Sequence, residues 1–163
     1  MLIAVISDTH MPRGARRLPD ACIERIRGAD LLLHAGDFST IEVLRELEAI
    51  GPPVAGVHGD VDSAELRRLL PEERTLEAGG ARIGLLHDAG PRKGRLERLR
   101  RRFGERADVV VFGHSHLPLH EQAEDGFQIL NPGSPTERRR APAHTMGLIR
   151  VADGLARCDV LDL

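Results

Sequence analysis

Short apolar runs recur along the chain, and polar or glycine residues follow each of them. Residues 2–6, 30–34 and 54–57 are three such runs, and residues 108–112 form a fourth that ends at Gly113. Unbroken apolar runs of this length are typical of strands that are covered on both faces. The pattern therefore predicts several buried strands spread over the length of the chain.

Segments with a helical spacing of apolar residues lie between these runs. We expect helices over residues 20–27, 41–50, 64–70 and 93–103. Thr40 precedes the second helix, and Ser63 or Asp62 precedes the third, and these residue types cap helix N-termini. Gly28 ends the first helix. The first part of the chain thus has a β-α-β-α-β order.

The last part of the chain favours antiparallel hairpins. Apolar arms flank turn sequences at Gly79-Gly80, Asp125-Gly126 and Asp153-Gly154. A β-α-β part followed by hairpins predicts the α/β class, with two packed sheets and helices outside. We expect one domain over residues 1–163, because no linker, internal repeat or low-complexity segment interrupts it.

Composition is ordinary for a globular protein, with 41% hydrophobic and 29% charged residues and a net charge of −2. This charge gives no general attraction to nucleic acid or to anionic membranes. Trp and Tyr are absent, which argues against a base-stacking platform. Cys22 and Cys158 are far apart, and residues 1–6 lack the basic flank of a signal peptide. We expect a cytoplasmic protein with reduced thiols and no membrane span.

Aspartate and histidine residues collect directly after the predicted strands. Seven of them do so: Asp8, His10, Asp37, Asp60, His87, His114 and His116. Sites in such sheets form beyond the carboxyl ends of strands. One Asp at a strand end is usually a turn or cap residue. Seven Asp and His residues that all directly follow predicted strands instead predict a metal site.

The donor types and their number indicate which metals suit the site. Carboxylate and imidazole without thiolate suit Mn²⁺, Zn²⁺, Fe or Ni²⁺. His114 and His116 are one residue apart, and in extended backbone they would point to opposite sides, which suits two ions better than one. Two ions about 3.5–4 Å apart need a bridging carboxylate and roughly three further ligands each. Seven side chains satisfy that count with one shared.

The ordered motifs resemble those of a known family. They are Asp8-Thr9-His10, Gly36-Asp37, Gly59-Asp60-Val61-Asp62, His87 and Gly113-His114-Ser115-His116. Together they resemble the calcineurin-like metallophosphoesterase superfamily. The short length and Asn131-Pro132-Gly133-Ser134 are similar to its small prokaryotic phosphodiesterase branch.

The resemblance implies a fold, a ligand set and a reaction. The fold is an αββα sandwich of two mixed sheets. Asp8, His10 and His116 would hold the first divalent ion, Asp37 would bridge, and Asp60, His87 and His114 would hold the second. Mn²⁺ is the favoured metal, with Ni²⁺, Zn²⁺ or Fe compatible. A metal-bridging hydroxide, positioned by Asp37 and Asp60, would attack a small phosphodiester in line.

Two positions depart from the family pattern. The family usually has Gly-Asn at Gly59-Asp60, so Asp60 adds a negative charge beside Asp8 and Asp37. A more electron-rich centre acidifies water less and attracts anionic substrates less. Many phosphomonoesterases and nucleases of the family have His where this chain has Val61. The absence of this histidine favours substrates with a good leaving group, or slow turnover.

Two alternatives to a small-molecule phosphodiesterase stay open. One is a non-catalytic interaction scaffold on the same fold, the role of a retromer subunit that shares it. The other is a nuclease-like phosphodiesterase. The arginine-rich residues 92–106 are better explained as a solvated helix face, and residues 138–140 as a basic loop or a phosphate contact.

Four further histidines are set apart from the ligand set. His34 is expected in the core or beside the ligands, and His58 is expected to be structural or near the pocket. His120 and His144 are expected on the surface.

Overall fold

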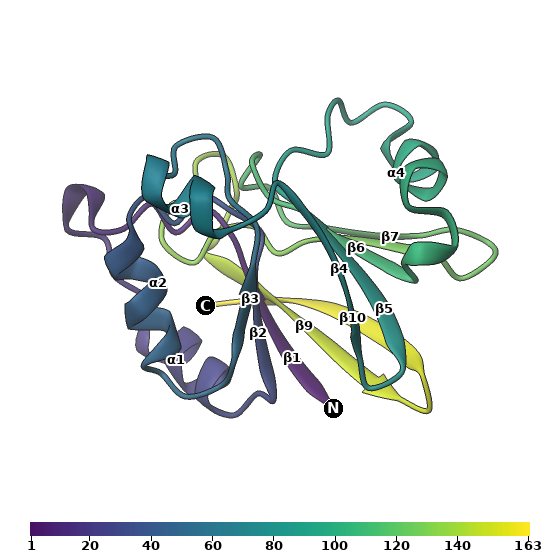
Figure 1. Ribbon diagram of the computed structural model, residues 1–163, viewed down its shortest axis with the longest axis horizontal. Helices are drawn as coiled ribbons and strands as arrows, with labels where there is room; N and C mark the ends of the chain where they lie inside the picture. The colour runs from purple at the N-terminus through teal and green to yellow at the C-terminus, as the bar shows by residue number, and fades with distance from the viewer.

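Two five-stranded sheets pack face to face between helices in the computed structural model, which describes residues 1–163 (Figure 1). The first sheet has the order β10-β9-β1-β2-β3, with β1 (Leu2–Ile6), β2 (Leu31–His34), β3 (Val54–Gly56), β9 (Thr145–Ala152) and β10 (Leu155–Asp162). The second has the order β4-β5-β6-β8-β7, with β4 (Glu73–Ala78), β5 (Ala81–Leu86), β6 (Val109–Val111), β7 (Leu119–Gln122) and β8 (Gln128–Asn131). The predicted αββα sandwich of two mixed sheets is confirmed.

Each sheet has a parallel part that gives it a defined carboxyl edge. In the first sheet β1, β2 and β3 are parallel, and the C-terminal hairpin joins them because β9 pairs antiparallel with β1. In the second sheet β5, β6 and β8 are parallel, and β4 and β7 are antiparallel edge strands. The carboxyl ends of β1, β2, β3, β5 and β6 meet at one edge of the molecule, where the loops that follow them carry the polar motifs.

The helices cover the outer faces of the two sheets. They are α1 (Asp20–Arg27), α2 (Ile41–Glu48), α3 (Ala64–Leu69) and α4 (Arg95–Phe103), with short 3-10 turns at Arg13–Ala15 and Gly104–Arg106. In Figure 1, α1, α2 and α3 lie on one side of the sandwich and α4 on the other. None of these helices combines the length and the apolar character needed to cross a bilayer.

Three apolar clusters correspond to the three interfaces between layers. In β1, Ile3 and Val5 face the second sheet, whereas Ala4 and Ile6 face the helices, as the two-residue period of a strand requires. On the far side, Phe103 of α4 packs against the second sheet. The central strands are therefore buried on both faces, which explains their unbroken apolar sequence.

Element boundaries differ from the sequence-based expectation in a few places. The last helix begins at Arg95 and not at residue 93, because Gly94 has a left-handed backbone with φ of 67°. The second helix ends at Glu48 and the third at Leu69, each earlier than expected. Ser63 caps α3, since its Oγ accepts the backbone N–H of Leu66 at 3.3 Å.

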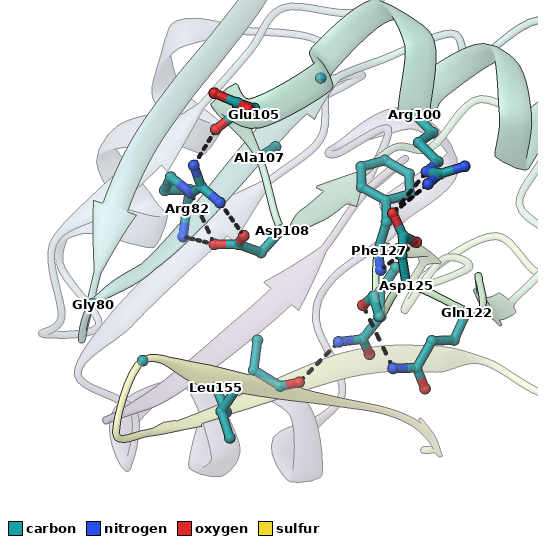
Figure 2. A pocket seen from close by; sticks show the side chains of 15 residues that line it. Gly80, Arg82, Arg100, Glu105, Ala107, Asp108, Gln122, Asp125, Phe127 and Leu155 are labelled. Atoms are coloured by element: carbon teal, nitrogen blue, oxygen red, sulfur yellow. Dashed lines mark hydrogen bonds and ion pairs between the residues drawn. The ribbon is translucent and has the colours of Figure 1, made fainter.

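The largest cavity, of about 850 Å³, lies away from the polar motifs, near the amino ends of β6 and β8 (Figure 2). Figure 2 shows that its arginines are neutralised: Arg82 pairs with Asp108, and Arg100 pairs with Asp125. Since none of the predicted site residues lines it, cavity size alone does not locate the candidate site.

Candidate metal centre

The structure brings all seven predicted residues to one edge of the sandwich. Asp8 and His10 follow β1, Asp37 follows β2 and Asp60 follows β3, all in the first sheet. The three remaining residues, His87, His114 and His116, follow β5 and β6 of the second sheet. The site thus lies between the two sheets and takes side chains from both.

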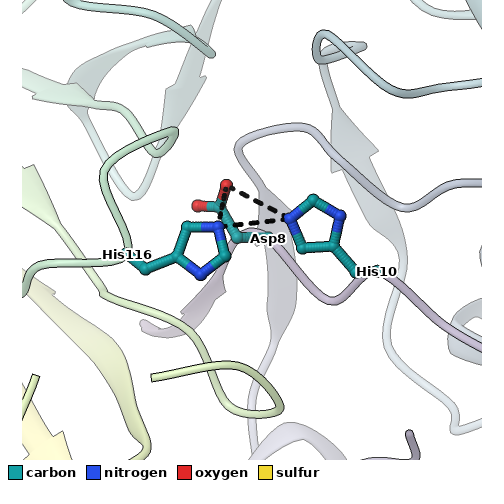
Figure 3. Close-up of side chains that lie close together, drawn as sticks. All are labelled: Asp8, His10 and His116. Atoms are coloured by element: carbon teal, nitrogen blue, oxygen red, sulfur yellow. Dashed lines mark hydrogen bonds and ion pairs between the residues drawn. The ribbon is translucent and has the colours of Figure 1, made fainter. Parts of the chain in front are cut away.

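Asp8, His10 and His116 form a first, buried group (Figure 3). The Nε2 atoms of His10 and His116 are 3.2 Å apart, and Asp8 Oδ1 lies 3.3 Å from His116 Nε2 and 3.9 Å from His10 Nε2. Ligand atoms about 2.0–2.2 Å from one ion lie roughly 3–3.5 Å from each other. The distances from His116 to His10 and to Asp8 have this spacing, and all three ligand atoms lie within 4.8 Å of one another.

Asp60, His87 and His114 form a second group that is more open to solvent. Asp60 Oδ2 lies 2.8 Å from His114 Nδ1 and 3.7 Å from His87 Nε2. The side chains of Asp60 and His114 are 59% and 49% exposed, whereas that of His87 is 5% exposed. A cation in this group would face solvent on one side.

Asp37 lies between the two groups. Its Oδ2 is 3.6 Å from His10 Nε2 in the first group and 3.2 Å from His87 Nε2 in the second. Its other oxygen, Oδ1, accepts the backbone N–H of Val61 at 3.0 Å, which fixes the carboxylate. One oxygen that reaches both groups has the geometry of a bridging ligand.

Five of the seven residues have a left-handed backbone, which non-glycine residues rarely adopt. Their φ angles are 57° for Asp8, 45° for His10, 61° for Asp37, 67° for His114 and 58° for His116. The expectation of extended backbone at His114 and His116 is therefore wrong. The two histidines still reach different groups, because the chain turns at each of them. Such conformations persist only where surrounding contacts impose them, and they concentrate at functional sites.

Backbone carbonyls orient two of the histidines. His116 Nδ1–H donates to Glu137 O at 2.5 Å, and His87 Nδ1–H donates to Ala35 O at 2.7 Å. Each Nε2 atom then faces the site, as in most metal-binding histidines. The backbone N–H of His114 donates to Asp8 Oδ2 at 3.0 Å and leaves Asp8 Oδ1 directed at the first group.

Unpaired buried atoms show that the residues fit a cation. Asp8 Oδ1 and His87 Nε2 are both buried and have no hydrogen-bond partner. A buried polar atom without a partner is costly, and it requires an explanation such as an ion. Both atoms point into the groups just described, so two cations would satisfy them.

The electrostatics of the site also suit positive charge. Burial raises the pKa of Asp37, but His87 and the Val61 N–H outweigh it and hold the pKa well below its usual range. Burial lowers the pKa of His87, but the Asp37 and Asp8 carboxylates outweigh it and raise the pKa to about 9. Burial is the dominant effect on His10 and lowers its pKa, which favours the neutral, metal-binding imidazole.

Sequence reasoning missed residues that hold the site together. Asp62 is buried, and its carboxylate accepts the backbone N–H groups of Asp37, Ser39 and Gly59 at 2.7–3.1 Å. It thereby ties the loop after β2 to the loop after β3. In the sequence, Asp62 stands out only as a candidate helix cap and as the last residue of Gly59-Asp60-Val61-Asp62.

The loop after β8 is a second missed support. Ser134 Oγ donates to Asp8 O at 2.8 Å, and the backbone N–H of Glu137 donates to Ser134 Oγ at 2.9 Å. The Glu137 carboxylate lies 3.8 Å from His10 Nε2 and pairs with Arg16 at 3.0 Å. In the sequence, this loop is marked by Asn131-Pro132-Gly133-Ser134 and by the basic residues 138–140, and neither signal indicates these contacts.

The other four histidines lie outside both groups. His34 is fully buried, stacks on Phe38 and bonds Thr9 Oγ1 at 3.1 Å, in agreement with a structural role. His58 lines a cavity beside Asp60 and His87. His120 is exposed as expected, whereas His144 is half-buried.

Comparisons with known proteins show what the chain is similar to. The sequence model of the calcineurin-like phosphoesterase superfamily domain matches residues 1–154. A probable metallophosphoesterase from Methanothermobacter thermautotrophicus is 40% identical over 149 residues, which are 91% of this chain and 85% of that protein. A phosphodiesterase from Methanocaldococcus jannaschii is 23% identical over 146 residues, 82% of this chain and 83% of that protein. Wild-type Vps29 complexed with zinc, from Entamoeba histolytica, is 25% identical with a TM-score of 0.77 over 99% of each chain.

Proposed function

Because the chain belongs to the calcineurin-like phosphoesterase superfamily, we propose that it is a metal-dependent phosphodiesterase acting on a small phosphodiester. Two divalent cations, when bound, would polarise the phosphoryl oxygens and activate water for in-line attack on phosphorus. Mn²⁺ is the favoured metal, and Ni²⁺, Zn²⁺ and Fe²⁺ suit the same donors. The ligands would be the seven residues of the two groups.

The single observation that carries this proposal is the position of Asp37. Its Oδ2 atom lies within 3.6 Å of His10 Nε2 and 3.2 Å of His87 Nε2, so one carboxylate oxygen reaches both groups. A shared carboxylate is what a pair of adjacent cations requires. A purely structural ion pair would need only one of these histidines.

The charge of the site favours diesters over monoesters. Asp8, Asp37 and Asp60 together contribute three negative charges, one more than an asparagine at position 60 would leave. With two divalent cations the sum is only +1, so a dianionic monoester gains less attraction than at a more positive centre. Val61 is half-exposed beside Asp60 and offers no proton to a poor leaving group. Asp37 and Asp60 would position the attacking water.

Hydrolysis of bis-p-nitrophenyl phosphate by protein loaded with Mn²⁺, Ni²⁺, Zn²⁺ or Fe²⁺ tests the proposal. We expect turnover with at least one metal, a metal content near two ions per chain, and slower hydrolysis of p-nitrophenyl phosphate. Asp37→Asn should lower kcat/KM by about 100-fold or more, because the bridging charge is lost. Asp153→Asn, at the exposed turn between β9 and β10, is the matched control and should leave kcat/KM unchanged.

A scaffold is the second candidate, and the similarity to zinc-bound Vps29 favours it. The same experiment separates the two. Tight metal binding without turnover on any phosphoester would support a protein that uses the metal centre for structure or docking. If the protein is a scaffold, Asp60→Asn should change its metal affinity, and the variant should be as inactive as the wild type.

A further inference from the structure

Another cavity, of about 340 Å³, lies beside the loop that carries His114 and His116, because Ser115 is part of its wall. We call it the arginine cavity, and its walls include Arg92, Arg95, Ser115, Leu117, Arg140 and Pro142. Ser115 is the residue between His114 and His116, and consecutive Cα atoms are only about 3.8 Å apart. The cavity therefore begins next to the two histidines of the loop that follows β6. It joins two basic segments that are more than forty residues apart in the sequence.

Among the four larger cavities, the arginine cavity is the one lined by basic residues without acidic residues. Three arginines line it and no acidic residue does. Each of the other three has acidic residues among its walls as well as arginines. In the largest one the arginines are visibly paired with aspartates (Figure 2). The positive charge of the arginine cavity has no comparable internal partner.

Arg95 is fixed in place but incompletely satisfied. Its Nη2 donates to Gly90 O at 2.7 Å, and its guanidinium lies 4.9 Å from the centre of the Phe112 ring. Its Nε atom is buried and has no hydrogen-bond partner. Burial, reinforced by the charge of Arg98, lowers the pKa of Arg95. An anionic oxygen would both pair with Nε and relieve this crowding of positive charge.

We propose that the arginine cavity binds a phosphate carried by the leaving group of the substrate, an inference that rests on the proposed phosphodiesterase function. Leu117, Pro118 and Pro142 supply apolar wall for the carbon skeleton that separates the two phosphates. Arg92, Arg95 and Arg140 hold the second phosphate. The substrate class is thus a phosphodiester whose leaving group has a terminal phosphate.

The dinucleotides pApA and ApA test this, because they differ only in a terminal 5′-phosphate. In either one, the oxygen of water bonds to the internal phosphorus, the bond from phosphorus to O3′ breaks, and O3′ takes a proton. The leaving group is AMP from pApA and adenosine from ApA. We expect kcat/KM for pApA to exceed that for ApA by about tenfold or more, since a hydrogen bond to a charged group contributes about that factor.

The double variant Arg92→Ala/Arg140→Ala removes two exposed charges from the cavity and should reduce this preference to about onefold. Arg101→Ala/Arg157→Ala removes two exposed arginines elsewhere and should retain the preference. A wild-type protein that hydrolyses bis-p-nitrophenyl phosphate but does not prefer pApA overturns the inference and leaves the proposed function intact. The same loss in both double variants also overturns it.

Binding of AMP to protein treated with EDTA provides a readout that is independent of turnover. Calorimetry should show affinity for AMP that falls about tenfold or more in Arg92→Ala/Arg140→Ala and not in the control double variant.

Absence of turnover on every diester would refute the proposed function, and the AMP titration would then decide on the cavity alone. Equal AMP affinity in the wild type and the cavity variant overturns the inference. So does an oligonucleotide affinity that falls equally in both double variants, because that pattern indicates a general nucleic-acid surface.

Discussion

His87 gives the metal-free site a pH dependence. Its imidazole is buried between two carboxylates, and its pKa is raised to about 9 from an ordinary value near 6.5. A raised pKa in the folded state stabilises the protein fully below about pH 6.5, and this contribution is lost as pH rises through about 9. The proton on His87 thus partly takes the place of a cation.

We therefore predict that the free energy of unfolding of the EDTA-treated protein falls between pH 6.5 and 9.5, by on the order of 3 kcal/mol. Urea denaturation at several pH values measures it. His87→Gln should flatten the pH dependence, whereas His120→Gln, at an exposed position, should retain it. Identical slopes for wild type and His87→Gln would contradict the assignment.

The positions of the seven site residues were predictable because each follows a strand, and strand ends can be read locally from the sequence. Their role as ligands stays a prediction. Asp62 and Glu137 were not predictable in the same way. Asp62 acts through N–H groups of residues 37, 39 and 59, and Glu137 acts through a carbonyl that His116 meets across the fold. Such partners depend on tertiary structure and leave no local pattern.

Among the elements, β5 and α4 are coupled through one glycine. A Cβ atom placed on Gly84 of β5 would lie 2.5 Å from the Phe103 ring, which is buried against the second sheet. Gly84 therefore allows α4 to pack closely on the strand, and its backbone does not need left-handed φ. The apolar character of residues 82–86 predicted the strand but not this contact.

Gly84→Ala should destabilise the protein by about 1–3 kcal/mol, because the added methyl forces Phe103 to move. Thermal and urea unfolding measure the change. Gly84→Ala/Phe103→Leu should be less destabilised than the sum of the two single variants, since the smaller side chain makes room for the methyl. Additive losses would show that the contact is not the cause.

The sequence predicted that the four helices exist, but it predicted their ends less accurately. The apolar spacing of residues 96, 99 and 103 defines the buried face of α4, and that face is observed. The exact start was set by the left-handed backbone of Gly94, which periodicity does not report. Periodicity also does not report the 3-10 turn at Arg13–Ala15.

For the molecule as a whole, the two-sheet architecture followed from the sequence, but the strand order did not. β9 pairs with β1 although about 140 residues separate them, and β8 lies between β6 and β7. Long-range pairing is selected by packing of both faces of a sheet, which a local pattern does not specify. This topology has a consequence for the site, since each group of candidate ligands takes residues from both sheets.

A cation in either group would therefore connect the two sheets, and its removal should loosen the sandwich. At a free concentration about 100 times Kd, each bound ion adds about 2.7 kcal/mol to the free energy of unfolding. For a chain of this length, that corresponds to a rise in Tm of roughly 5–10 °C per site. Scanning calorimetry with Mn²⁺ and with EDTA measures the difference.

His116→Ala should lose the part of the rise that belongs to the buried group, whereas His120→Ala should keep all of it, because His120 lies outside both groups. An equal rise in wild type and His116→Ala would show that the metal does not bind between the sheets at this group.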